Sequence, residues 1–165
     1  IAWQRAHPKL LDIHFVADYQ ESMALAEVRG GAVILSASGM CEAGRVKYHL
    51  ANNLPRPECT VLITGFQAAG TLGRRLVDGA RNVRIFGQPV PVRASIVTTG
   101  GLSAHADQAA LLGWLRSFRH PPGQTFVVHG EPEAAGALAT ALRRDFGWPG
   151  VEVPAYGSEW RLSGL

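Results

Sequence analysis

The chain has 165 residues, of which 47% are hydrophobic and 18% are charged, with a formal net charge of +3. This composition is typical of globular proteins and excludes a wholly disordered chain, while the small positive charge permits a polyanionic partner without requiring one. No apolar run approaches the roughly 18 residues that a membrane span needs. The two cysteines, Cys41 and Cys59, form no C-x-x-C motif, which disfavours a disulfide scaffold and favours a reducing cytoplasm.

The first half of the chain alternates predicted strands with predicted helices. Apolar runs between turn signals predict short strands at 14–17, 32–35, 60–64 and 83–86, and those at 32–35 and 60–64 are expected to be buried. Helices are expected at 18–29, with Asp18 as N-cap, at 43–53, and around Leu72 to Val77. Alternation of this kind predicts an α/β fold with a parallel or mixed sheet and flanking helices. Ligands of such sheets bind beyond the carboxyl ends of the strands.

Residues 87–91 contain two prolines and interrupt this alternation, so we expect two modules that meet near residue 90, over 1–90 and 91–165. In the second module, strands are expected at 92–99, 125–128, 151–153 and 159–162. Helices are expected at 107–118 and 132–145.

Two histidines of the second module follow predicted strands and precede predicted helices. His105 lies before the helix that begins at Asp107, and His129 comes directly after the strand at 125–128. If these strands were neighbours in one sheet, both imidazoles would lie at the same edge, where they could bind a metal ion or transfer protons. A polar residue at a strand end, bonded only to backbone, is the equally weighted alternative.

Two carboxylates close to these histidines also have two interpretations each. Asp107 can orient His105 through a hydrogen bond or cap the following helix, and both roles can hold together. Glu131 is interpreted as a first-turn carboxylate that the helix dipole favours, with support of the neighbouring histidine as the alternative.

Two glycine-containing loops of the first module follow predicted strands and lead towards helices, where free amides attract anions. Neither fits a Walker loop or G-x-G-x-x-G, so helix–strand packing remains the alternative interpretation. Arg45, Lys47, Arg74 and Arg75 on the following helices could also contact phosphate, or could simply be solvated. The candidate phosphate-binding residues are Ser36, Ser38, Gly39, Gly65, Gly70 and Thr71.

Four strings occur in order along the chain: V-I-L-S-A-S-G-M at 33–40, G-F-Q-A-A-G-T-L-G at 65–73, S-A-H-A-D at 103–107 and V-H-G-E at 128–131. Together they resemble the β-CASP branch of the metallo-β-lactamase-fold RNA-processing ribonucleases, related to the endonuclease of the cleavage and polyadenylation machinery. The resemblance implies the end of a β-CASP domain over 1–90. It implies a βαβαβ piece of the αββα lactamase fold over 91–165.

The resemblance also implies a zinc-dependent RNA hydrolase with roles for both histidines. His105 would be the catalytic residue that protonates the leaving oxygen or stabilises the transition state, and His129 would be a ligand of a two-zinc site. RNA and the missing N-terminal half of the same protein are the implied partners. A homodimer is allowed, and no membrane partner is expected.

The family's main zinc motif, H-x-H-x-D-H, does not occur in this sequence. Because zinc normally needs at least three protein ligands, this polypeptide alone is expected neither to cleave RNA nor to bind zinc stoichiometrically. Two alternatives stay open: a noncatalytic RNA-binding or scaffold relative of the family, and an unrelated nucleotide-binding α/β domain.

Overall fold

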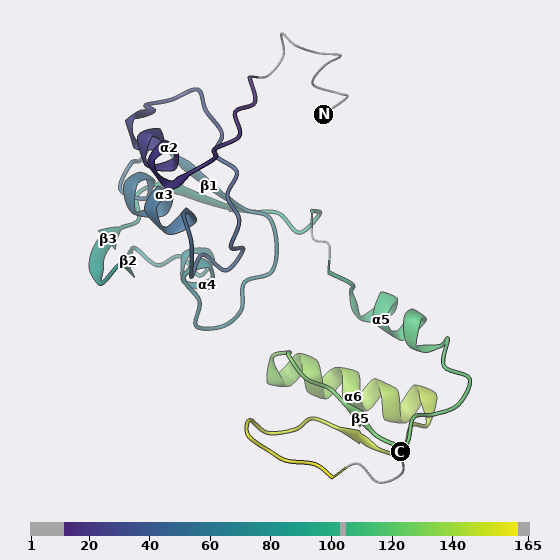
Figure 1. Ribbon diagram of the computed structural model, residues 1–165. Helices are drawn as coiled ribbons and strands as arrows, with labels where there is room; N and C mark the ends of the chain where they lie inside the picture. The colour runs from purple at the N-terminus through teal and green to yellow at the C-terminus, as the bar shows by residue number, and fades with distance from the viewer. Residues whose placement is uncertain (1–11, 103–104, 162–165) are drawn as a thin grey trace. The chain divides into compact units, whose positions relative to one another are not determined.

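The computed structural model describes residues 12–102 and 105–161. The chain forms two compact units, residues 1–102 and 103–165, and each is described by itself below (Figure 1). The elements of unit 1 are α2 (Tyr19–Ala24), a 3-10 helix (Leu25–Glu27), α3 (Val46–Asn53), β1 (Thr60–Ile63), α4 (Leu72–Val77), β2 (Asn82–Ile85), β3 (Gln88–Pro91) and β4 (Ser95–Thr98). Those of unit 2 are α5 (Gln108–Leu115), β5 (Thr125–Phe126), α6 (Pro132–Phe146) and β6 (Val151–Glu152). The predicted α/β class, with mixed strand pairing and flanking helices, is confirmed.

Unit 1 is built on a parallel pair of strands, β1 and β4, in which Thr60 lies opposite Ser95 and Ile63 opposite Thr98. Between them in the sequence come α4 and the β2–β3 hairpin, which supply much of the core. The side chains buried most completely in this core are Leu54, Leu72, Leu76 and Ile85.

The strand expected at 60–64 is present, but only one of its faces is covered. Ile63 is buried, whereas Leu62 on the other face is 53% exposed and Val97 of β4 is 45% exposed. The expectation of a fully buried strand is therefore wrong, because a two-stranded sheet with helices against one face leaves the other face open.

Residues 32–35 do not form a strand, and the prediction of a buried one is wrong. Val33 and Leu35 are 87% and 93% exposed. An apolar run is buried only where another element covers it, and no described strand pairs with this segment. The expected strands at 14–17 and, within the described residues, at 159–161 are likewise absent.

The β2–β3 hairpin corrects the interpretation of residues 87–91 as a break. Ile85 pairs with Gln88, so Phe86 and Gly87 form a two-residue turn, and both have positive φ, +52° and +76°. Positive φ at both central residues is the pattern of a type I′ hairpin turn. Pro89 fits in β3 because a strand at a sheet edge tolerates a residue without an N–H donor.

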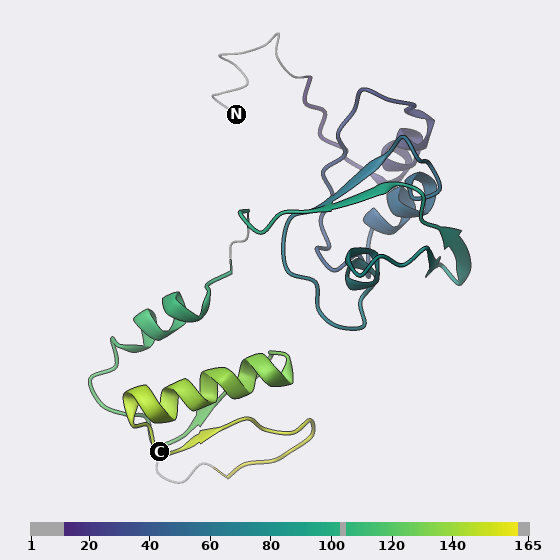
Figure 2. The same cartoon turned by 180° about the vertical axis from the view of Figure 1, so that it is seen from behind.

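Unit 2 consists of α5 and α6 with the short parallel pair β5–β6 (Figure 2). Leu142 of α6 packs with Val151 of β6 and with Trp148, which follows the left-handed cap residue Gly147. The views in Figures 1 and 2 agree that α6 lies alongside the strand pair. Among the described residues of the whole chain, no helix has the length and apolar character to cross a membrane.

Two helix starts occur as the sequence predicts. The Asp18 carboxylate accepts the Glu21 amide at 2.8 Å at the start of α2, and the Asp107 carboxylate accepts the Ala110 amide at 2.8 Å at the start of α5. Side-chain caps of this kind satisfy amides that have no partner within the helix. Helix ends agree less well, since α2 ends at Ala24 and α5 at Leu115, both earlier than expected.

Candidate functional site

In unit 1, the loop at 38–42 and the loop at 65–73 are bonded to each other. The Gln67 side-chain amide donates to the Gly39 carbonyl at 2.9 Å, and the Gly73 amide donates to the Met40 carbonyl at 3.1 Å. The Glu42 carboxylate accepts the Leu72 amide at the start of α4. Two of the four family strings therefore form one structural feature, which we call the loop pair.

Gln67 is the centre of the loop pair and is only 6% exposed. Its amide nitrogen also donates to the Phe66 carbonyl at 2.9 Å, while its Oε1 is buried without a hydrogen-bond partner. A Cβ at Gly73 would lie 1.6 Å from that oxygen, so this position admits glycine alone while Gln67 keeps its place. In the sequence, Gln67 stands out only as part of the string at 65–73.

The candidate phosphate ligands of the loop pair already make local contacts. The Thr71 hydroxyl donates to the Ala68 carbonyl at 2.7 Å and accepts the Arg74 amide at 3.2 Å, so it caps α4. The Ser38 hydroxyl accepts the Ala43 amide at 3.3 Å. These bonds fix the loops, and each hydroxyl keeps part of its bonding capacity.

A shallow hollow lies at the carboxyl ends of β1 and β4 in unit 1. Of the candidate phosphate ligands, Gly65 lines this hollow. Ser36 and Gly39 are exposed. Gly70 has a φ of +82°, a conformation that favours glycine. The parallel pairing adds residues that the sequence does not indicate, because Ile63 of β1 pairs with Thr98 of β4 and the segments that follow line one hollow. The hollow is lined by Gly65, Phe66, Gln67, Arg74, Val77, Asp78, Thr98, Thr99 and Gly100.

Arg74 is the cation of this hollow. Its Nε donates to both carboxylate oxygens of Asp78, at 2.9 and 3.0 Å. A polyanion that binds here would therefore compete with Asp78 for the guanidinium.

In unit 2, His105 and His129 are both exposed and lie in loops that precede α5 and α6. The first two residues of the S-A-H-A-D string, 103–104, lie outside the described residues. Among the described strands, β4, which precedes His105, pairs with β1, and β5, which precedes His129, pairs with β6. A common site for the two histidines stays a prediction.

His129 has an unusual backbone conformation, with φ of +60°. Left-handed backbone is uncommon for a residue with a side chain and costs about 1–3 kcal/mol. Residues in this conformation occur often at functional sites. Gly130 follows at once, and a Cβ there would meet the Ala135 side chain at 3.7 Å. His129 is therefore an exposed residue with left-handed backbone in the loop between β5 and α6.

The carboxylates beside the histidines have different local roles. Asp107 caps α5, as one of its two interpretations predicted. Glu131 is the N-cap residue of α6, but its side chain makes no capping bond, and its carbonyl accepts the Ala135 amide at 2.9 Å. Orientation of a histidine by either carboxylate stays a prediction.

Across residues 12–102 and 105–161, no group of three or more His, Cys, Asp or Glu side chains is placed to hold a metal ion. His129 offers the right donor type for zinc, an exposed imidazole, but a zinc site needs further ligands. The described residues by themselves therefore do not make a zinc site.

Comparison with known families gives two matches that together span most of the chain. Residues 3–76 match the Beta-Casp domain, and residues 89–153 match the Zn-dependent metallo-hydrolase RNA specificity domain. The chain belongs to the β-CASP family of metallo-β-lactamase-fold RNA-processing proteins. The loop pair falls within the first match, and both histidines fall in the second.

Three relatives show the range of this β-CASP chain's similarity. A ribonuclease of Thermus thermophilus is 38% identical over 130 residues, which is 79% of this chain and 29% of the relative. Transcription termination factor FttA of Pyrococcus abyssi is 31% identical over 147 residues, 86% of this chain and 23% of the factor. An RNase J-like protein of Methanocaldococcus jannaschii is 32% identical over 124 residues, 75% of this chain and 28% of that protein. The chain thus spans less than a third of each of these relatives.

Proposed function

We propose that this chain is part of a zinc-dependent ribonuclease that hydrolyses RNA phosphodiesters. The observation that carries the proposal is the match of residues 89–153 to the Zn-dependent metallo-hydrolase RNA specificity domain, a range that includes both His105 and His129. The two family matches also support modules over 1–90 and 91–165. Free thiols at Cys41 and Cys59 support a reducing compartment such as the cytoplasm.

His105 is proposed as the group that acts on the leaving oxygen of the cleaved phosphodiester. A protonated imidazole can donate its proton to the departing ribose oxygen as the P–O bond breaks, which avoids release of a strongly basic alkoxide. Its exposed position just before α5 leaves the ring accessible to a substrate.

His129 is proposed as one zinc ligand. The other ligands would come from a region of the longer protein that corresponds to the part of the relatives that this chain does not span. Zinc, when bound, supplies an activated water and stabilises negative charge on phosphate. His129 is exposed and has left-handed backbone in the loop that precedes α6. Glu131, two residues on, is proposed to support the ligand histidine.

The loop pair and the adjoining hollow are proposed to contact the RNA backbone. Backbone amides at Gly39, Gly65 and Gly70 and the hydroxyls of Ser36, Ser38 and Thr71 are suitable donors to phosphate oxygens. Thr98 and Thr99, at the end of β4, line the same hollow as Gly65.

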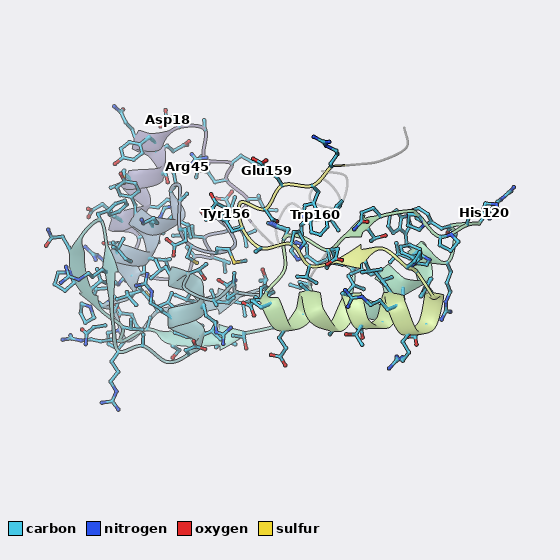
Figure 3. All side chains as sticks on the ribbon, turned by 90° about the horizontal axis from the view of Figure 1, so that it is seen from below. Asp18, Arg45, His120, Tyr156, Glu159 and Trp160 are labelled. Carbon is cyan, nitrogen blue, oxygen red and sulfur yellow. The ribbon has the colours of Figure 1, made fainter. Side chains whose placement is uncertain are left out.

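The test uses a longer protein that contains this chain. His105→Ala is expected to lower the rate of RNA cleavage by about 10²–10⁴-fold with zinc content unchanged. His129→Ala is expected to lower both cleavage and zinc content. His120→Ala is the matched control, because His120 is an exposed histidine of unit 2 outside both family strings (Figure 3).

Cleavage that survives His105→Ala at the unsubstituted rate would contradict the proposed role. Zinc-bound longer protein that binds RNA without cleaving it would instead favour the noncatalytic RNA-binding relative. The isolated 165-residue chain is expected to be inactive, and metal-dependent cleavage by the pure chain would contradict that expectation. Sedimentation of the longer protein, alone and with RNA, would decide whether it forms a homodimer.

A further inference from the structure

Three aromatic side chains from separate elements of unit 1 form a continuous row. Tyr19 of α2 meets Tyr48 of α3 edge to face, with ring centroids 5.4 Å apart, and Tyr48 meets Phe86 at the hairpin tip with centroids 4.4 Å apart. Tyr19 and Phe86 at the two ends are 51% and 49% exposed. A hydrogen bond with the Tyr48 side chain raises the pKa of Tyr19, so its phenol stays neutral at physiological pH.

Three cationic side chains accompany this row. The Lys47 ammonium lies 5.1 Å from the centre of the Phe86 ring, and the Arg84 guanidinium donates to the Gly87 carbonyl at 3.0 Å, beside the hairpin tip. At the other end, Arg45 donates to the Asp18 carbonyl at 3.1 Å, next to Tyr19, and Figure 3 shows Asp18 and Arg45 side by side. We call these six residues the aromatic–basic row: Tyr19, Arg45, Lys47, Tyr48, Arg84 and Phe86.

The acidic groups near the row are already engaged. The Asp18 carboxylate caps α2 through the Glu21 amide, and the Glu21 carboxylate accepts the Ala17 amide at 2.5 Å and contacts His14 at 2.5 Å. Both carboxylates keep their negative charge, so the three cations of the row leave a small local excess of positive charge beside the half-exposed Tyr19 and Phe86.

Phe86 occupies a position that its residue type disfavours. With φ of +52° it is the first central residue of the hairpin turn, where asparagine, aspartate or glycine is preferred. Its ring contacts the Tyr48 ring and the Lys47 ammonium, and 49% of the residue is exposed. A bulky aromatic residue in this strained conformation, half exposed to solvent, is a position at which a functional role can be tested.

We propose that the aromatic–basic row binds single-stranded RNA, with unpaired bases stacked on the Tyr19 and Phe86 rings and phosphates held by the three cations. Rings with exposed faces next to basic side chains are the arrangement that binds single strands with little sequence preference. None of the six residues lines the hollow at the ends of β1 and β4, and none belongs to the loop pair. The choice of RNA as the strand rests on the proposed function.

The test measures binding of the full 165-residue chain to fluorescein-labelled oligouridylate by fluorescence anisotropy. Phe86→Leu and Tyr19→Leu, which remove a ring but keep an apolar side chain, are each expected to weaken binding about fivefold or more. Phe86→Trp is expected to retain binding, because the indole ring can still stack on an RNA base. Phe118→Leu is the matched control, since Phe118 is a 48% exposed aromatic residue of unit 2.

A duplex of oligoadenylate with oligouridylate separates stacking from charge. The ring substitutions are expected to leave binding of the duplex unchanged. Lys47→Gln is expected to weaken binding of both the single strand and the duplex and to reduce the salt dependence of that binding. Circular dichroism of each variant checks that it is folded.

The proposal is overturned if folded Phe86→Leu and Tyr19→Leu bind oligouridylate as tightly as the unsubstituted chain, or if that chain does not bind it at all. A change in self-association with unchanged RNA binding would assign the row to protein contact instead, which also overturns it. None of these results depends on cleavage, so loss of the row would leave the proposed roles of His105 and His129 to their own test.

Discussion

The loop pair of unit 1 and the histidine loops of unit 2 carry the same kind of sequence signal but differ in structure. The loop pair is held by hydrogen bonds between its two strings around the buried Gln67. The histidine loops present exposed imidazoles just before helices. A family string can therefore consist of residues that pack against one another, as in unit 1, or of residues with exposed side chains that are able to contact a partner, as in unit 2.

Because of this difference, substitutions in the two regions should change different measured quantities. Substitutions in the loop pair should change the free energy of unfolding, because its side chains contact one another. Substitutions of His105 or His129 should change activity or metal content and leave the fold of unit 2 intact, because exposed side chains away from caps contribute little to stability.

The largest stability effect is expected at Gly73. In Gly73→Ala the new Cβ would collide with Gln67 Oε1, so the Gln67 amide must leave its bonds to Gly39 and Phe66. Overpacking of this kind costs about 1–3 kcal/mol. Urea unfolding followed by tryptophan fluorescence and circular dichroism measures the change.

A second substitution tests the reason for that cost. Gln67→Ala removes the colliding oxygen, so the double variant Gly73→Ala/Gln67→Ala should be more stable than the sum of the two single changes predicts. Gly136→Ala is the control glycine, because a Cβ in the middle of α6 meets nothing within 4 Å. It should stabilise the chain by about 0.5–1 kcal/mol. Additive effects at 67 and 73 would refute the steric explanation.

The next effect concerns Asp107, whose carboxylate caps α5 in one of the histidine loops. Asp107→Ala should destabilise unit 2 by about 1 kcal/mol through loss of the cap on Ala110, whereas Asp107→Asn should retain nearly all of the stability. Unfolding curves of the two variants measure this difference.

The same pair of variants separates the cap from support of His105. In the longer protein, Asp107→Asn should lower RNA cleavage only if the carboxylate also acts on His105, because an amide caps the helix without a negative charge. Equal cleavage by Asp107→Asn and the unsubstituted protein would leave capping as its whole role.

Sequence reasoning succeeded where the cause of a structure is local. The caps at Asp18 and Asp107 follow from a short polar side chain placed before an apolar helix, and no distant residue is needed. The same reasoning fails at 32–35, where burial depends on another element, and at 87–91, where the prolines predict a break although an edge strand accepts Pro89.

The candidate site divides in the same way. Thr71 and Ser38 could be named because hydroxyl groups beside glycine are visible in the sequence. The central position of Gln67 and the place of Thr98 in the hollow could not, because they depend on the contact between 38–42 and 65–73 and on the register of β1 with β4.

The smallest expected effect is on the pH dependence of stability. It comes from His49, a partly buried histidine of unit 1, whereas the histidines of the unit 2 loops are exposed. Burial, and to a lesser extent the charge of Arg45, lower the pKa of His49, whose ring is bonded to the Ser22 hydroxyl at 3.1 Å. The unfolded chain then binds the proton more readily, so this contribution to stability is complete above about pH 6.5 and is lost as the pH falls through the folded-state pKa.

Urea unfolding at a series of pH values between 7 and 5 (roughly the range of histidine titration) should show this loss. His49→Gln, which keeps a hydrogen-bonding group near Ser22 but cannot take up a proton, should flatten the dependence. Glu21 and Glu58, whose pKa values are also lowered in the folded chain, act in the carboxylate range below this window. An unchanged slope in His49→Gln would place the titrating group elsewhere. A flattened slope would show that a histidine of unit 1 contributes to folding, in contrast to the surface roles proposed for His105 and His129.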